Sequence, residues 1–303
     1  MIINSYDLKG KFLETYQKRW LNALKSGDDD IICFGYPDTQ VKFFYKKYCE
    51  FIYSIIKKNF KSKDIKKLNL LELGCGRGTA SIFLEKKLNL KVIGVDFSSE
   101  SIQIAKNNAS KYSSNARFIK GDIFEPEKIL KDSNLESKKF DIIISLGVLE
   151  HIEDIDNCFK IHFNLMNKNG LFVAMIVPEK KSIQDFFSPL NRILVKINRR
   201  EKKELNLKHL DRKTLSKTDD VYRSFKNKNF YKNKLEKCGY KEVLAIESNP
   251  FPTIRPLNKF LEKILVNTYN LILIFLKVLS RNDCFFNCST NLSRCHFLQG
   301  FKR

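Results

Sequence analysis

The chain lacks an uninterrupted apolar run that would identify it as a membrane protein. Its first residues, MIINSYDLKGKFLETYQ, have no apolar stretch of the kind that signal peptides carry, so we expect a cytoplasmic protein. The most apolar segment, 257–279, is interrupted by Lys, Glu and Asn and falls short of the roughly 18 to 20 apolar residues that a spanning helix needs. Three interpretations of it stay open: a spanning helix, a helix lying peripherally on an anionic membrane, or a cap packed on the protein's own core.

Acidic residues are scarce relative to basic ones. The chain has 34 Asp and Glu against 55 Lys and Arg, which gives a formal net charge of +21. Such a charge favours an anionic partner, such as nucleic acid, phospholipid head groups or a phosphorylated metabolite. The lysines are spread through nearly every polar stretch, however, which is more typical of a general bias towards solubility. With 303 residues and 43% hydrophobic content, the chain has enough apolar side chains to form a buried core.

The eight cysteines lack the spacing of a metal site or a disulfide framework. Five are scattered singly, and we expect them to be reduced packing residues: Cys33, Cys49, Cys75, Cys158 and Cys238. Cys284, Cys288 and Cys295 lie closer together and are followed by His296, but their spacing matches no zinc template. We therefore expect no metal and interpret these three as thiols packed beside phenylalanines.

Short apolar runs alternating with helical patterns dominate the middle of the chain. The runs are typical of buried strands and lie at 68–73, 91–96, 116–122, 140–146 and 171–177. Amphipathic helical patterns lie between them, at 79–88, 99–112 and 154–166. This alternation predicts the α/β class, with a parallel sheet covered by helices on both faces.

The ends of the chain are predicted to add a cap and insertions to this core. Residues 1–62 form an N-terminal helical cap or lid that contains an amphipathic helix at 41–60, and 63–303 form the main domain. The Lys-rich stretch 179–229 is predicted to be an insertion over the sheet, and a second insertion covers about 250–294.

Regular elements are predicted again around the second insertion. A helix at 230–238 and a strand at 240–248 precede it, and a last strand at 295–302 follows it.

The sharpest motif is a glycine-rich loop placed between a predicted strand and a predicted helix. It runs Glu72-Leu-Gly74-Cys-Gly76-Arg-Gly78, and Asp96 closes the next strand 18 residues later. Glycines let a ligand approach backbone N–H groups, and a carboxylate at that position can accept both ribose hydroxyls of a nucleoside. No Lys follows Gly78 and the spacing is not G-x-G-x-x-G, which argues against pyrophosphate. The negative charge of Glu72 favours a ligand with an ammonium and a sulfonium group.

These motifs resemble the class I S-adenosylmethionine (SAM) dependent methyltransferases, especially the small-molecule group that includes the ubiquinone and menaquinone biosynthesis enzymes. The resemblance covers roughly 40–178 and 230–303. LLELGCGRG is similar to the family's first motif, VDFS (95–98) to its second and GDIF (121–124) to its third. The resemblance implies SAM as cofactor and a Rossmann-like seven-stranded sheet in the order 3-2-1-4-5-7-6, with strand 7 antiparallel.

The resemblance also assigns roles to individual residues. Asp96 would bind the ribose, Asp122 the adenine amino group and the Ile123 backbone the ring, and Leu146 ends the strand under the methionine part. The expected cofactor contacts are Glu72, Gly74, Gly76, Gly78, Asp96, Phe97, Asp122, Ile123 and Leu146. Ordinary alternatives stay open, because the glycines could form a tight turn, Asp96 could cap a helix near Ser99, and Gly-Asp is common turn chemistry.

His151 follows the fourth strand, beside the place where a methyl acceptor is expected. It could act as a general base, or it could be a structural or substrate-positioning residue. Because methyl transfer depends on alignment and on exclusion of water, a lid is expected. The candidates are the N-terminal helix, with Tyr16 and Trp20 upstream of it, and 179–229.

Three functions fit the sequence. A methyltransferase acting on O, N or C of a small-molecule or lipid-linked acceptor fits the apolar segment and the aromatic N-terminal helix. An RNA or protein methyltransferase fits the charge, although Ser145-Leu-Gly-Val-Leu-Glu stands where base N-methyltransferases often have an Asn/Asp-Pro-Pro-Tyr motif. The third is a SAM-binding protein without turnover, which the intact loop and Asp96 argue against.

Overall fold

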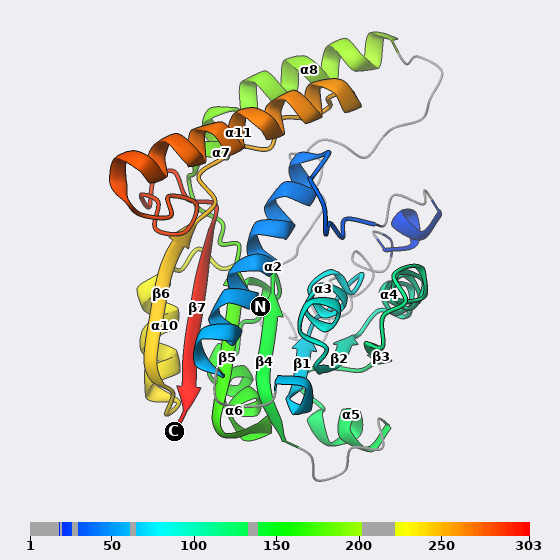
Figure 1. Cartoon of the computed structure of the whole chain (residues 1–303), viewed down its shortest axis with the longest axis vertical. Coiled ribbons are helices and arrows are strands. Elements are labelled where there is room, and N and C mark those ends of the chain that lie inside the picture. The colour runs from blue at the N-terminus through cyan, green and yellow to red at the C-terminus, as the bar shows by residue number, and fades with distance from the viewer. Residues whose placement is uncertain (1–17, 19, 26–29, 61–64, 133–138, 202–221) are drawn as a thin grey trace, which may run out of the picture.

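A computed structural model of the chain describes residues 18, 20–25, 30–60, 65–132, 139–201 and 222–303. Its centre is a seven-stranded sheet in the order β3-β2-β1-β4-β5-β7-β6 (Figure 1). The strands are β1 (Asn69–Leu73), β2 (Lys91–Asp96), β3 (Arg117–Lys120), β4 (Phe140–Leu146), β5 (Met166–Ile176), β6 (Lys241–Ser248) and β7 (Cys295–Lys302). Only β7 runs antiparallel to its neighbours, β5 and β6. The predicted fold class and strand order are confirmed.

Helices cover both faces of the sheet because successive strand residues point to opposite sides. Leu70 packs in a core with α2 (Gln40–Asn59), α3 (Thr79–Leu88) and α4 (Ser99–Lys111). Its neighbour Leu71 packs in a second core, on the other face. The helices of that core are α5 (Pro126–Asp132), α6 (Ile155–Leu165) and α10 (Lys228–Lys237).

The predicted elements agree with the structure to within a few residues, with one exception. The strands predicted at 91–96, 140–146 and 295–302 and the helix predicted at 79–88 have the observed bounds. The exception is β5, which begins at Met166 rather than at residue 171. Its first residues, MNKNG, are mostly polar, so the apolar pattern gave no sign of them.

An aromatic cluster joins α2 to the second half of the chain. Phe285 is fully buried, and its ring lies 6.1 Å from Phe43 and 5.8 Å from Tyr48 of α2, measured between centroids. At the start of the helix, the Gln40 side chain donates to the carbonyl of Ile254 and accepts from its N–H. The α2 helix is therefore an integral part of this face of the protein.

The described part of the predicted first insertion contains the helices α7 (Ile183–Phe186) and α8 (Ser188–Glu201). Residues 202–221 of this insertion lie outside the described part of the chain. The chain then returns to the end of β5. There the N–H of Ser224 donates to the carbonyl of Glu150 at 2.7 Å, and that of Glu179 donates to Ser224 at 2.9 Å.

The predicted second insertion contains α11 (Lys259–Ser280), a helix of 22 residues. Among the described helices it alone is long and apolar enough to cross a membrane, judged by length and composition. It packs on α2 through a narrow stripe, and only Val266 and Tyr269 are buried. Leu265 and Leu273 are half-buried against the core, and most of the other α11 side chains are left exposed by the described residues. This argues against the interpretation of 257–279 as a packed cap.

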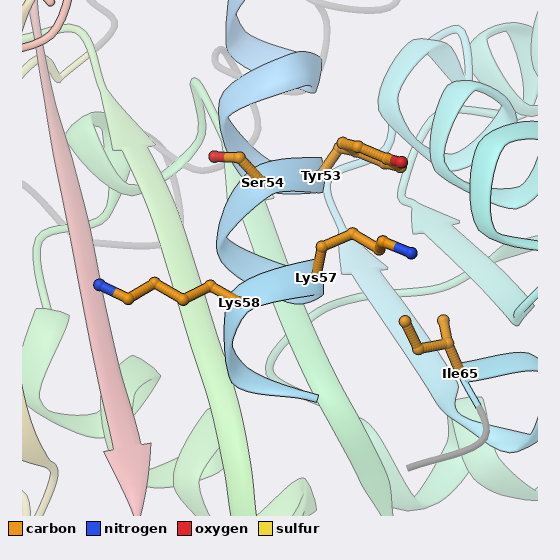
Figure 2. Close-up of a pocket in the computed structure, with 5 residues that line it drawn as sticks. All are labelled: Tyr53, Ser54, Lys57, Lys58 and Ile65. Carbon is orange, nitrogen blue, oxygen red and sulfur yellow. The ribbon is translucent and has the colours of Figure 1, made fainter. Parts of the chain in front are cut away.

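A shallow hollow lies beside the last turns of α2 (Figure 2). It is lined by Tyr53, Ser54, Lys57 and Lys58 of that helix and by Ile65 of the short 3-10 helix η1 (Ile65–Lys67). The two lysines stand in the last turn of α2, where positive charge stabilises the helix dipole. None of the predicted site residues lines this hollow.

Candidate functional site

The predicted site residues come together at the carboxyl ends of the parallel strands. Backbone hydrogen bonds tie each strand end to its neighbour: Gly74 N–H to Val95 O at 2.8 Å, Gly121 N–H to Asp96 O at 2.9 Å and Gly147 N–H to Met175 O at 2.8 Å. The order of the strands reverses between β1 and β4, and open α/β sheets bind ligands at such a switch point. The topology therefore forms a rigid floor for a ligand.

The glycine loop requires glycine for steric reasons. Gly74 has φ of 76°, and a Cβ built on it would lie 2.2 Å from Cγ2 of Val148. Gly78, at φ 76°, is the N-cap of α3 and has no side chain that could cap the helix. The loop thus brings bare backbone to the end of β1 at the start of a helix, as the sequence predicts.

Asp96 anchors this loop to the neighbouring strand. Its Oδ2 accepts from Gly76 N–H at 2.9 Å, and its Oδ1 accepts from Ser98 N–H at 3.0 Å. The carboxylate is 5% exposed, and burial raises its pKa. The cap of α4 is Ser98, whose side chain accepts from Ser101 N–H, so the interpretation of Asp96 as the helix cap is wrong. The Ser101 side chain and the Phe97 backbone also hydrogen-bond to this carboxylate, which partly offsets the rise in its pKa.

Glu72 points into the protein. Its Oε2 accepts from the backbone N–H of Ser81 at 2.9 Å and from the Ser81 hydroxyl at 2.5 Å, both in the first turn of α3. Burial raises its pKa to about 7. The negative charge expected for Glu72 is therefore corrected, because near neutral pH the carboxyl is only partly ionised. Its observed contacts position the helix behind the loop.

Trp20 covers the glycine loop from the N-terminal side. A Cβ on Gly76 would lie 3.1 Å from the Trp20 ring, and the Arg77 guanidinium stacks over that ring at 5.3 Å from its centroid. The side chain is half-buried in a short helical stretch, 20–25. Trp20 thus lies against the glycine loop, where a lid over the site is expected. Tyr16 lies outside the described residues.

The remaining predicted contacts lie around the same edge of the sheet. Leu146 ends β4, Phe97 follows Asp96, and Ile123 lies in the loop after β3; all three are half-buried. Asp122 makes a local turn, because its Oδ1 accepts from Phe124 N–H at 2.9 Å. This is the ordinary turn chemistry that the sequence left open for it, and its contact with adenine stays a prediction.

His151 belongs to a pair of titratable groups in the short 3-10 helix η2 (Leu149–His151) after β4. Its Nδ1 lies 3.0 Å from the carbonyl oxygen of Tyr222, which can only accept, so in the neutral ring this nitrogen carries the proton. Its Nε2 lies 3.9 Å from Oε1 of Glu150. Burial raises the pKa of Glu150 to about 7, and the other oxygen of this carboxyl, Oε2, has no hydrogen-bond partner among the described residues.

Sequence reasoning missed Glu150 and Tyr222. Glu150 directly precedes His151 after the fourth predicted strand, and this position is the sequence feature that could have identified it as a site residue. Tyr222 contributes a backbone carbonyl, so no pattern of side chains could have identified it.

The cysteine-rich segment near the C-terminus does not converge on one point. Cys284 contacts Ser280 Oγ at 3.3 Å, whereas Cys295 contacts Ser248 Oγ at 3.1 Å. His296 is buried and bonds through Nδ1 to Glu247 Oε2 at 2.9 Å. In the part of the chain that the structure describes, no three His, Cys, Asp or Glu side chains are grouped as metal ligands.

Comparison with known proteins identifies the family. A family model described as a methyltransferase domain matches residues 64–237, which include the glycine loop, Asp96 and η2. The chain belongs to this family of SAM-dependent methyltransferases. Its cofactor is therefore S-adenosylmethionine, as the motifs predicted.

Individual relatives agree with this placement. The ubiquinone biosynthesis O-methyltransferase of Pelagibacter ubique (strain HTCC1062) is 37% identical over 121 residues, which are 40% of this chain and 47% of that protein. The chain spans less than half the length of the first curated relatives that it matches.

Two solved methyltransferases share the fold of this family member. The plantazolicin methyltransferase solved with SAH has a TM-score of 0.54 at 14% identity, over 98% of each chain. The magnesium protoporphyrin IX methyltransferase of Synechocystis PCC 6803, also with bound SAH, has a TM-score of 0.51 at 14% identity, over 99% of this chain and all of that one.

Proposed function

We propose that the chain transfers a methyl group from SAM to a small-molecule or lipid-linked acceptor at the carboxyl edge of its sheet. The observation that carries the proposal is the anchored loop, in which Gly76 N–H and Asp96 share a hydrogen bond beneath Trp20. Bound SAM supplies an activated methyl group: the acceptor's lone pair attacks the methyl carbon, the carbon–sulfur bond breaks, and its electrons stay on sulfur.

The residues of the site fit a sulfonium nucleoside. The Asp96 carboxylate stands at the end of β2, where a carboxylate suits two vicinal ribose hydroxyls, and the glycines at 74, 76 and 78 admit the ligand close to the backbone. Phe97, Ile123 and Leu146 add half-buried apolar surface, and Asp122 stands beyond β3 where an adenine amino group would be. Glu72 holds the first turn of α3 in place behind these contacts. We assign these nine residues to the cofactor site, in which Glu72 supports the loop from behind.

Trp20 and the segment after residue 221 would close the site. Trp20 lies against the loop, and Tyr222 and Ser224 bond to His151 and Glu150 of η2. Together they exclude water and align the acceptor, which is the main contribution that a displacement at carbon needs. We therefore propose the N-terminal segment and the insertion at 179–229 as the two lids of a domain formed by 63–303.

His151 is the candidate for removal of the acceptor's proton. Tyr222 fixes the tautomer whose Nε2 carries the lone pair, and the neighbouring Glu150 has a pKa of about 7. A base of this kind is useful for a hydroxyl acceptor, and the similarity to ubiquinone biosynthesis O-methyltransferases supports oxygen as the acceptor atom. The alternative role of His151 is to position the lid segment through Tyr222.

The remaining candidates concern the acceptor and the cell compartment. A small-molecule acceptor is favoured over RNA or protein, because relatives named ubiquinone biosynthesis O-methyltransferases match 35% to 40% of this chain. The net charge of +21 is the observation that favours RNA. We place the protein in the cytoplasm, with peripheral attachment to membrane.

The test is methyl transfer from labelled SAM to separated lipid, small-metabolite and RNA fractions. We expect counts in the lipid or small-metabolite fraction. Counts in RNA alone would replace the proposed acceptor, and SAM binding with no transfer to any fraction would indicate a protein without turnover.

A His151→Gln variant in the same assay separates the two roles of this residue. If His151 is the base, wild-type kcat should fall as pH drops and the ring is protonated. His151→Gln should then lower kcat most at high pH and remove this pH dependence, with KM little changed. A positioning role predicts a raised KM without a change in the pH profile.

A further inference from the structure

The α11 helix exposes an apolar surface that the rest of the described chain leaves uncovered. In its second half Leu271, Phe275 and Val278 are 66%, 62% and 74% exposed, and Phe260 in its first turn is 71% exposed. Buried apolar side chains stabilise a fold, whereas exposed ones of this size in one continuous surface mark a binding face. The helix therefore carries more apolar surface than its packing on α2 uses.

The arrangement of residues around α11 divides the helix into three faces. At about 100° per residue, positions 260, 264, 271, 275 and 278 fall within about 60° of one another and form the apolar face. Lys259, Lys263 and Lys277 are all exposed and fall within about 40° of one another, along one edge of that face. The third face, with Val266 and Tyr269, is the one packed on the protein.

The α8 helix repeats this pattern. Leu190, Ile193 and Ile197 are exposed at helical spacing, and Arg192 and Lys196 are exposed along one edge of that stripe. We call the exposed apolar and basic residues of α8 and α11 the apolar–basic surface.

The segment that leads into α11 holds both helices. Asn191 of α8 donates to the carbonyl of Thr253 at 2.9 Å and accepts from Arg255 N–H at 3.1 Å. Tyr269 of α11 donates to the carbonyl of Pro252 at 2.8 Å. The two helices are therefore fixed relative to the same backbone.

This surface lies at the end of the molecule where the candidate site is found. Figure 1 shows α8 and α11 beyond the ends towards which the arrows of β1, β2 and β4 point. The glycine loop, Asp96 and His151 follow these same strand ends. A partner bound to the apolar–basic surface therefore lies on the side from which an acceptor enters.

We propose that the apolar–basic surface docks this protein on an anionic lipid bilayer, with α11 lying in the head-group layer. A helix with an apolar face and lysines along its edge is suited to that layer, because the side chains enter the acyl boundary while the ammonium groups meet lipid phosphates. The only acidic residue of α11, Glu262, is turned away from the surface, since its Oε2 accepts from Gln40 N–H at 2.8 Å. No carboxylate of α11 thus opposes an anionic surface.

Polar contacts between α11 and the rest of the protein argue against a membrane-spanning α11. Besides Glu262 and Tyr269, Asn267 of this helix accepts a hydrogen bond from Tyr36 at 2.8 Å. Insertion across the bilayer would break these contacts and place three lysines in hydrocarbon, which is costly. Docking in the plane of the interface keeps all of them.

Co-sedimentation with phosphatidylcholine vesicles, with and without phosphatidylglycerol, tests the proposal. The wild-type chain is expected to bind the vesicles that contain phosphatidylglycerol. Phe275→Ser/Val278→Ser should lower the partition coefficient by at least about tenfold, because two exposed side chains that enter the acyl boundary are lost. Leu244→Ser/Leu292→Ser is the matched control, since these side chains are 57% and 43% exposed elsewhere, and it should bind as wild type does.

The charge contribution is tested by Lys263→Glu/Lys277→Glu. This variant should bind the anionic vesicles about tenfold or more weakly than the wild type. The control is Lys106→Glu/Lys131→Glu, which makes the same change of net charge at exposed residues of other helices. The control should bind clearly better than Lys263→Glu/Lys277→Glu. Equal losses in both would show that total charge alone decides the binding and would overturn the proposal.

Titration with SAH separates this inference from the proposed function. All four variants are expected to bind SAH as the wild type does, because none of the substituted residues belongs to the site. A wild type that binds SAH but neither type of vesicle overturns the docking surface and leaves the methyltransferase assignment intact. A dimer that Phe275→Ser/Val278→Ser dissociates, seen by sedimentation velocity without vesicle binding, assigns the surface to a second copy and also overturns the proposal.

Discussion

At the residue scale, the glycine loop can form because Gly74 has no side chain. Gly74→Ala would force a left-handed residue with a Cβ and bring it to 2.2 Å from Cγ2 of Val148. We expect a loss of about 2–4 kcal/mol in the free energy of unfolding, and a matching loss of SAM binding. Chemical denaturation and calorimetry measure the two effects.

Two further variants separate the causes at this position. Gly74→Ala/Val148→Ala removes the clash but keeps the strained φ, so it should recover part of the stability. Gly35→Ala is the control, because nothing lies within 4 Å of the added Cβ and no positive φ is involved. If Gly74→Ala were as stable as Gly35→Ala, the steric account of the loop would be wrong.

Glu150 makes the stability of the protein depend on pH. Its pKa is raised from 4.5 to about 7 in the folded protein, so the folded state binds the proton more tightly than the unfolded state. Protonation of Glu150 therefore contributes at most about 3 kcal/mol to the free energy of unfolding. This contribution is complete below about pH 4.5 and is lost as pH rises through about 7. Glu150→Gln should therefore flatten the decline of the free energy of unfolding in this window.

Chemical denaturation at a series of pH values measures how steeply the free energy of unfolding changes with pH. Glu72, whose pKa is also about 7, contributes a similar decline and should give an additive effect in Glu72→Gln/Glu150→Gln. Glu153→Gln, at an exposed carboxyl three residues from Glu150, is the control. A slope in Glu150→Gln equal to that of wild type would contradict the assignment of a buried, proton-binding carboxyl.

At the scale of elements, the attachment of α2 and α11 to the sheet rests on the aromatic cluster around Phe285. Phe285 is fully buried, and its ring is also 4.9 Å from that of Phe286. Phe285→Ala should reduce the free energy of unfolding by about 3–5 kcal/mol through the lost burial and the cavity. Phe275→Ala, at a residue 62% exposed on α11, is the control and should change it by less than about 0.5 kcal/mol. Similar losses in both variants would show that α11 is covered in solution.

Helices and strands could be predicted from the sequence wherever their burial leaves a regular pattern of apolar residues. The runs at 91–96 and 140–146 are apolar because both faces of those strands are covered, so their ends could be predicted to the residue. The short α5 was missed because PEKILKD offers too few turns for a helical period. The α8 helix was missed because its apolar residues are exposed among basic ones and so resemble a solvated loop.

At the scale of the whole molecule, the site was predictable where it depends on motifs and not where it depends on tertiary contacts. The glycine loop and Asp96 were found because their spacing along adjacent strands determines where they meet. The orientation of Glu72 into α3, the approach of Trp20 to Gly76 and the carbonyl of Tyr222 at His151 depend on how distant segments pack. No periodicity or motif encodes such contacts.

The central claim is that the glycine loop and Asp96 together form the binding site for SAM. Isothermal titration of the purified chain with SAH, for wild type and Asp96→Ala, tests it most directly, with thermal unfolding to confirm that the variant is folded. We predict binding by the wild type and a loss of about 1–3 kcal/mol of binding free energy in the variant. Equal affinity in a folded Asp96→Ala protein, or no heat of binding with the wild type, would contradict the account.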